Sequence, residues 1–180
     1  MLTYRRSDTL KVVGYSDADL GGCVDNRWST TGYIFTLAGG AISWKNCKQS
    51  IATSSTMQAE FIACYEAIGQ AVWLKNFVPS LRIVDSISKP LTLYCDNQAA
   101  VLFSGNNKPT DGSKHLDLKY YVVKDRTQDQ TIKVEHISTK LMLADSLTKG
   151  LPHNLFNTAC TKYEFSGEPL TLGNRAMYSQ

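Results

Sequence analysis

Three short segments near the start of the chain decide the fold: Lys11-Val-Val-Gly-Tyr-Ser-Asp17, Gly32-Tyr-Ile-Phe-Thr-Leu-Ala38 and Ala41-Ile-Ser-Trp-Lys45. Their length and their β-branched and aromatic residues are typical of strands. The turn-forming residues Asp-Leu-Gly-Gly at 19–22 follow the first segment, and Gly39-Gly40 is a tight-turn signal between the second and the third. We therefore expect a three-stranded antiparallel meander.

The residues after this meander indicate helices that alternate with strands. An amphipathic stripe with helical spacing begins after Ser55, which has the spacing of a capping box with Gln58, and we expect Pro79 to close this helix. Strands are expected at 90–96 and 131–137, and helical segments are expected after Asn97 and at 114–127 and 143–149. This order predicts an α/β fold: a five-stranded mixed sheet, an antiparallel meander plus parallel strands, with helices on both faces.

Composition limits the class of protein. The 180 residues are 43% apolar and 19% charged, with a net charge of +3, which suits one globular domain and permits nucleic-acid binding without demanding it. No apolar run approaches a membrane span, no signal peptide is recognisable, and the five cysteines form no Cys-x-x-Cys pair. We expect an intracellular protein without membrane contact, organised as a linker at 1–10, a domain at 11–152 and a weakly structured tail at 153–180.

Four carboxylates point to chemistry. Asp17 and Asp96 end the first and fourth predicted strands, so they converge if those strands are parallel neighbours. Glu60 lies at the edge of the apolar stripe of the long helix, and Asp145 begins the last helical segment. Each acid alone is explained well enough by a turn, a cap or a lysine partner. Four converging acids need a cation, and a cysteine-free oxygen site favours Mg²⁺ or Mn²⁺ over Zn²⁺.

The sequence also resembles a known family, the ribonuclease H domain of copia-type LTR-retrotransposon Pol polyproteins of the plant kind. The resemblance covers about residues 3–156. It is carried by an ordered series of strings: Gly14-Tyr-Ser-Asp-Ala-Asp-Leu-Gly-Gly22, Ser29-Thr-Thr-Gly-Tyr-Ile-Phe35, Gly39-Gly-Ala-Ile-Ser-Trp44, Ser55-Thr-Met-Gln-Ala-Glu-Phe61, Val72-Trp-Leu-Lys75, Tyr94-Cys-Asp-Asn-Gln-Ala-Ala100, Ser113-Lys-His-Leu-Asp117, Glu135-His-Ile-Ser-Thr139 and Ala144-Asp-Ser-Leu-Thr-Lys-Gly-Leu151.

This resemblance implies the ribonuclease H-like fold and hydrolysis of the RNA strand of an RNA–DNA hybrid by a two-metal mechanism. Its catalytic and metal-binding quartet falls on Asp17, Glu60, Asp96 and Asp145, with two Mg²⁺ ions as cofactor and Mn²⁺ as a substitute. The expected products carry 5′-phosphate and 3′-hydroxyl ends. The expected partners are the hybrid and a reverse transcriptase domain in the same polyprotein, in a cytoplasmic retroelement particle or in the nucleus.

The sequence departs from the family pattern mainly in its histidines. Many ribonucleases H carry a mobile histidine before the last catalytic aspartate, but the segment at 138–144 contains none. We interpret His136, on the preceding strand, as a packing or hydrogen-bonding residue. Smaller departures at Gln58, Tyr121, Lys124 and Ser146 remove no acid.

Candidate substrate contacts are less specific than the acids. Asn97 and Gln98 follow Asp96 and could reach ribose 2′-hydroxyls, although capping of the next helix explains Asn97 equally well. Lys119 shares a helix face with His115 and Arg126, which a solvated charged surface explains better than substrate binding. Arg27 and Trp28 could contact a DNA backbone, and Trp28 and Trp44 could equally belong to the core.

Two other functions remain open. An integrase-like or transposase-like nuclease uses the same fold with a similar acid triad, and a non-catalytic module could bind nucleic acid or tether a reverse transcriptase. The fourth acid and the Asp-Asn-Gln and Ala-Asp-x-Leu-Thr-Lys strings favour ribonuclease H.

Overall fold

A computed structural model describes residues 11–23, 27–38, 40–81, 90–105 and 114–149. The predicted linker at 1–10 and the predicted tail at 153–180 lie outside the described residues. The elements in chain order are β1 (Val12–Asp19), β2 (Thr30–Leu37), β3 (Gly40–Lys48), α1 (Thr56–Ser80), β4 (Leu91–Cys95), α2 (Gln98–Gly105), α3 (Lys114–Gln128), β5 (Ile132–His136), the 3₁₀ turn η1 (Thr139–Leu141) and α4 (Asp145–Thr148).

The strands form one sheet in the order β3-β2-β1-β4-β5. β2 pairs antiparallel with both β1 and β3, whereas β4 pairs parallel with β1 and with β5. The predicted mixed sheet with its meander is therefore confirmed. β2 and β3 are longer than the apolar segments suggest, because Thr30 and Thr31 continue the ladder opposite Lys48 and Cys47.

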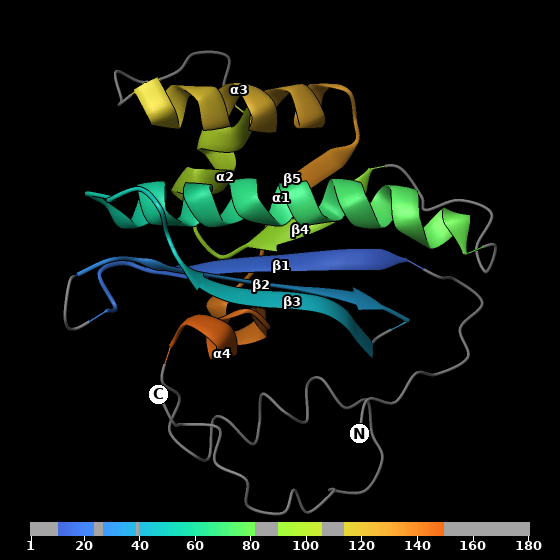
Figure 1. Cartoon of the computed structure of the whole chain (residues 1–180), viewed down its shortest axis with the longest axis horizontal. Coiled ribbons are helices and arrows are strands. Elements are labelled where there is room, and N and C mark those ends of the chain that lie inside the picture. Colours follow the sequence, from blue (N-terminus) through green and yellow to red (C-terminus); the bar gives the residue numbers. More distant parts are fainter. Residues whose placement is uncertain (1–10, 24–26, 39, 82–89, 106–113, 150–180) are drawn as a thin grey trace, which may run out of the picture.

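Helices cover both faces of the sheet, as the sequence predicts (Figure 1). The helices α1, α2 and α3 lie on one side, and the main core there contains the buried side chains of Phe35, Phe61, Ile68, Leu93 and Tyr120. The short helix α4 lies on the other side, over a smaller cluster of Ile34, Ala41, Met142 and Ala144.

Gly32 on β2 allows α4 to lie close to the sheet. A Cβ atom at Gly32 would come within 2.6 Å of Thr148 Cγ2, which requires a shift of α4 or of the Thr148 side chain, and within 3.0 Å of Leu147 Cβ, which is an unusually tight contact. A glycine at this position therefore fixes the approach of α4, which carries the last of the candidate acids.

Helix α1 begins as its sequence predicts and ends slightly later. Ser55 Oγ accepts a hydrogen bond from Gln58 N over 3.3 Å, whereas the Gln58 side chain accepts from Ser54. The helix continues to Ser80, one residue past Pro79, because a proline near the end removes only one donor from the last turn.

Two further observations concern the molecular surface. The side chain of Trp44 on β3 is 56% exposed, so the core interpretation of this residue is wrong.

Within the described ranges, no helix is long and apolar enough to cross a membrane.

Candidate metal centre

Two of the candidate acids lie on neighbouring parallel strands. The register of β1 and β4 places Ser16 opposite Cys95, so Asp17 and Asp96 follow at the same edge of the sheet. Asp17 is fully buried within β1, and Asp96 follows the last residue of β4 and is partly exposed. The sequence predicts that Asp17 and Asp96 converge if their strands are parallel neighbours, and β1 and β4 are parallel neighbours in the structure.

Helix α1 brings Glu60 to this edge. Its side chain is buried, and its carboxyl group accepts a hydrogen bond from the backbone of Ala18, just beyond the part of β1 that pairs with β4. The possible ligand atoms of Glu60, Cys95 and Asp96 all lie within 4.8 Å of one another. The site therefore also contains a thiol, which the expectation of a cysteine-free site overlooks.

Asp145 reaches the cluster through a lysine. Asp145 begins α4, and its carboxylate forms an ion pair with the ammonium group of Lys149. The same ammonium nitrogen lies 3.6 Å from Asp17 Oδ1. The structure thus gathers all four predicted acids at one end of the sheet, while their roles as metal ligands stay predictions.

Burial shifts the pKa of two of these acids, Asp17 and Glu60. Burial raises the pKa of Asp17 to about 6, against the lowering effects of the Thr148 hydroxyl and of Lys149. Burial raises the pKa of Glu60 further, to about 10, and the neighbouring Cys95, Asp17 and Asp96 add to the rise. Glu60 is therefore protonated at neutral pH in the absence of a cation.

Lys149 carries the compensating charge. Burial opposes its protonation, but the hydrogen bond to Asp145 and the charges of Asp17, Asp145 and Asp96 outweigh burial and raise the pKa of Lys149 to about 12. The cluster therefore stabilises a positive charge strongly.

The donors fit a hard divalent cation. Asp17 Oδ2 accepts a hydrogen bond from Thr148 Oγ1, but Asp17 Oδ1 is buried with no hydrogen-bond donor. Contact with the Cys64 thiol and burial both raise the pKa of Cys95, so this residue stays a neutral thiol and a poor ligand. The remaining donors are carboxylate oxygens, which suit Mg²⁺ or Mn²⁺.

Sequence reasoning missed three residues that hold these acids. Thr148 and Lys149 lie three and four residues after Asp145, and this helical spacing could have pointed to them. Thr139 Oγ1 donates to Asp96 Oδ2 over 3.0 Å, a contact between distant segments with no local signal. His136 Nε2 donates to the carbonyl oxygen of Asp96 over 3.1 Å, so the hydrogen-bonding interpretation of His136 is confirmed.

Of the candidate substrate contacts Asn97, Gln98 and Arg27, the first caps a helix and the other two are exposed. Asn97 Oδ1 accepts from Ala100 N over 3.0 Å, which is the capping role. Gln98 begins α2 beside Asp96, and its side chain is exposed. Arg27 is exposed in the connection between β1 and β2, with a left-handed φ of 59°.

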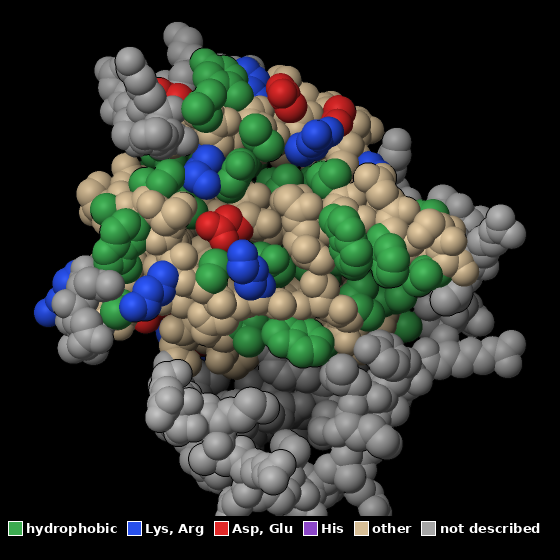
Figure 2. All heavy atoms as spheres, viewed as in Figure 1, with side chains coloured by type: hydrophobic (Ala, Val, Ile, Leu, Met, Phe, Trp, Pro, Cys, Tyr) green, Lys and Arg blue, Asp and Glu red, His purple; other side chains and the backbone are tan. Residues whose placement is uncertain are grey.

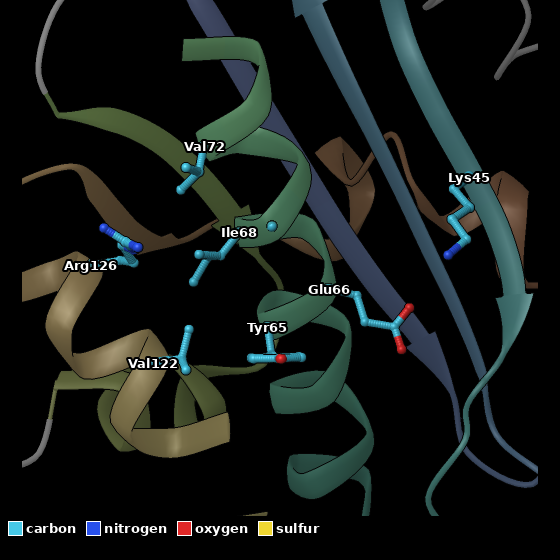
Figure 3. A pocket seen from close by; sticks show the side chains of 8 residues that line it. Lys45, Tyr65, Glu66, Ile68, Val72, Val122 and Arg126 are labelled. Atoms are coloured by element: carbon cyan, nitrogen blue, oxygen red, sulfur yellow. The ribbon is translucent and has the colours of Figure 1, made fainter. Parts of the chain in front are cut away.

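The predicted exposed basic face of α3 is wrong for Lys119. Its ammonium nitrogen lies 3.9 Å from the ring centroid of Tyr65 on α1, and burial lowers its pKa. Arg126 lines a cavity of about 400 Å³ between α1 and α3, together with Tyr65 and Val122 (Figure 3). The side chain of His115 lies outside the described residues.

Figure 2 shows how the basic side chains of the described residues are distributed on one face of the molecule. Among the described residues on the face shown in Figure 2, Lys and Arg side chains are scattered between other residue types.

Comparison with known proteins identifies relatives over most of the chain. No family model matches the chain. It is 42% identical over 143 residues to the "Retrovirus-related Pol polyprotein from transposon TNT 1-94" of Nicotiana tabacum, which is 79% of this chain and 10% of the relative. It is 32% identical over 158 residues to the polyprotein from transposon RE1 of Arabidopsis thaliana, which is 88% of this chain and 11% of the relative. The chain thus spans about a tenth of the length of these curated relatives.

Solved structures share its fold at low sequence identity. The N-terminal RNase H domain of a Mycobacterium tuberculosis protein superposes with a TM-score of 0.55 at 16% identity, covering 85% of this chain and 98% of that domain. LC11-RNase H1 in complex with an RNA/DNA hybrid gives 0.53 at 15% identity, covering 76% and 93%. The chain is therefore a homologue of one segment of the plant transposon Pol polyproteins, and it has the ribonuclease H fold.

Proposed function

We propose that the chain is a metal-dependent ribonuclease H, an endonuclease that hydrolyses the RNA strand of RNA–DNA hybrids during reverse transcription of a retroelement. The observation that carries this proposal is the gathering of Asp17, Glu60, Asp96 and Asp145 at one end of the sheet, where the acids interact electrostatically and where a buried Asp17 oxygen has no hydrogen-bond donor. The ribonuclease H fold and the Pol homology support it, as does the hybrid bound to LC11-RNase H1.

The four carboxylates would hold two Mg²⁺ ions, with Mn²⁺ as a substitute. When bound, the ions stabilise the charge on the attacking and leaving oxygens of an in-line displacement, which yields 5′-phosphate and 3′-hydroxyl ends. Thr148 and Thr139 orient Asp17 and Asp96 through their hydroxyl groups. Glu60 must release its proton before its carboxylate can hold a cation, because burial keeps it neutral.

The substrate contacts of this proposal are Gln98, two residues after Asp96, and Arg27 in the connection between β1 and β2. We propose that the exposed amide of Gln98 reads a 2′-hydroxyl and that the exposed Arg27 contacts a phosphate. Lys119 is not included, because its ammonium group packs on Tyr65. We further propose a reverse transcriptase domain in the same polyprotein as partner, within a retroelement particle in the cytoplasm or in the nucleus.

A substrate panel tests this function. The purified chain is incubated in Mg²⁺ with end-labelled RNA–DNA hybrid, double-stranded RNA and double-stranded DNA, and the product ends are identified by phosphatase and ligase treatment. We expect cleavage of the RNA strand of the hybrid alone. Equal cleavage of double-stranded DNA would favour an integrase-like nuclease, and hybrid binding without cleavage would favour a non-catalytic module.

A further inference from the structure

Lys149 connects the surface to the buried part of the acid cluster. Its side chain is 40% exposed, whereas the Asp17 side chain that it approaches is 0% exposed. The ammonium nitrogen pairs with Asp145 and lies 3.6 Å from Asp17 Oδ1, the oxygen that lacks a hydrogen-bond donor. One monovalent cation is thus shared between two of the four carboxylates and offsets one of their two negative charges.

The backbone around Lys149 is held in place, while its side chain has a route to solvent. The Lys149 N–H donates to Asp145 O over 3.1 Å, and Thr148 Oγ1 donates to Asp17 Oδ2. Gly32 lets this helix contact the sheet directly. Because the side chain is partly exposed, a change of rotamer can withdraw the ammonium group without moving α4.

The contacts exceed those of an ordinary helical ion pair. A surface pair at i and i+4, such as Asp145 and Lys149, contributes little to stability by itself. The second contact, with Asp17, involves a carboxylate that has lost its hydration, and such a charge needs a counter-charge to remain in the fold. Lys149 supplies that counter-charge.

We propose that Lys149 is a built-in counter-cation of the acid cluster that a divalent metal ion must displace, so that Lys149 sets the metal concentration at which the site fills. This inference rests on the proposed function, because it requires the same carboxylates to bind the metal. The ammonium group and a divalent ion need the same oxygens of Asp17 and Asp145, so they exclude each other. An internal competitor of this kind weakens the apparent affinity for the metal while it stabilises the metal-free fold.

Calorimetric titration with Mn²⁺ and urea unfolding in chelator test the inference together. The variants are Lys149→Gln, Lys149→Arg and the control Lys133→Gln. Lys133 is exposed and pairs with Glu135 over 2.6 Å, so its variant also loses one charge and one ion pair. We expect Lys149→Gln to bind Mn²⁺ roughly ten-fold more tightly than the wild type, equivalent to about 1.4 kcal/mol. The same variant should be less stable than the wild type in chelator.

The other two variants separate competition from a merely structural role. Lys149→Arg retains the competing charge, so its Mn²⁺ affinity should not exceed that of the wild type, and Lys133→Gln should match the wild type. If the wild type binds Mn²⁺ and Lys149→Gln binds it no more tightly, the inference is overturned while the proposed metal site stands. If neither the wild type nor Lys149→Gln binds Mn²⁺, the proposed function fails together with the inference.

Discussion

Replacing Asp17 by asparagine should stabilise the metal-free protein at alkaline pH. Asp17 is fully buried, and its pKa in the folded protein is about 6 against an ordinary value of 3.8. Because the folded pKa is raised, ionised Asp17 disfavours the folded state. This penalty is absent below pH 3.8, grows between pH 3.8 and about 6, and is complete above that range.

The size of the effect follows from the same shift. Roughly two pKa units at about 1.4 kcal/mol per unit give an upper limit of about 3 kcal/mol. That limit already includes the favourable contacts of Asp17 with Thr148 and Lys149. The asparagine amide group needs an acceptor that the aspartate does not, so we expect a gain of about 1–3 kcal/mol at pH 8.

Urea unfolding in excess chelator at pH 8 and pH 4 measures this difference. Asp125→Asn, which changes an exposed carboxylate on α3, is the matched control and should alter stability little at either pH. The gain for Asp17→Asn should be present at pH 8 and nearly absent at pH 4. A variant less stable than the wild type at pH 8, or an equal gain at both pH values, would refute the electrostatic reasoning.

Three further predictions concern activity and stability. Asp96→Asn and Asp145→Asn each remove one carboxylate charge from the proposed metal site, and each should slow hybrid cleavage by ~10³-fold, which corresponds to ~4 kcal/mol of barrier. The circular dichroism spectrum should stay unchanged. Activity near that of the wild type in either variant would exclude that acid from the site. His136→Ala should retain most of the cleavage rate, because its ring donates only to the Asp96 carbonyl oxygen; a folded but inactive variant would require an essential imidazole. Ser55→Ala removes the acceptor that caps α1 and should lower the free energy of unfolding by about 1 kcal/mol in urea; an unchanged value would show that the Gln58 N–H finds another acceptor.

Much of the fold can be predicted from local sequence because the relevant signals are local. Short segments rich in β-branched and aromatic residues, separated by Gly-rich turns, predict the meander. The Ser55 cap and the apolar stripe that follows it predict α1. The chain order then leaves few sheet topologies. Strand ends are harder to predict, since Thr30 and Lys48 join the ladder through pairing with each other rather than through their own hydrophobicity.

Some contacts of the site can likewise be predicted from local sequence, and others depend on distant segments. Asp17 and Asp96 can be placed together because the ends of neighbouring parallel strands meet. Glu60 on the stripe edge and Asp145 at a helix start are candidates from the sequence pattern, and the resemblance assigns all four acids to one quartet. The contacts of Thr139 with Asp96 and of Lys149 with Asp17 join segments far apart in the chain, so spacing does not reveal them. For Lys119, local spacing suggests an exposed basic face of α3. A distant contact changes this, because the Lys119 ammonium group packs on the ring of Tyr65 on α1.

Metal-dependent cleavage of a hybrid tests the central claim most directly. The measurement is the rate at which the wild-type chain cuts the labelled RNA strand of an RNA–DNA hybrid in Mg²⁺, in Mn²⁺ and in excess chelator. Because four carboxylates gather at one end of the sheet and one buried Asp17 oxygen there has no hydrogen-bond donor, we predict cleavage with either ion and none in chelator. Undiminished cleavage of the RNA strand in excess chelator would contradict the account.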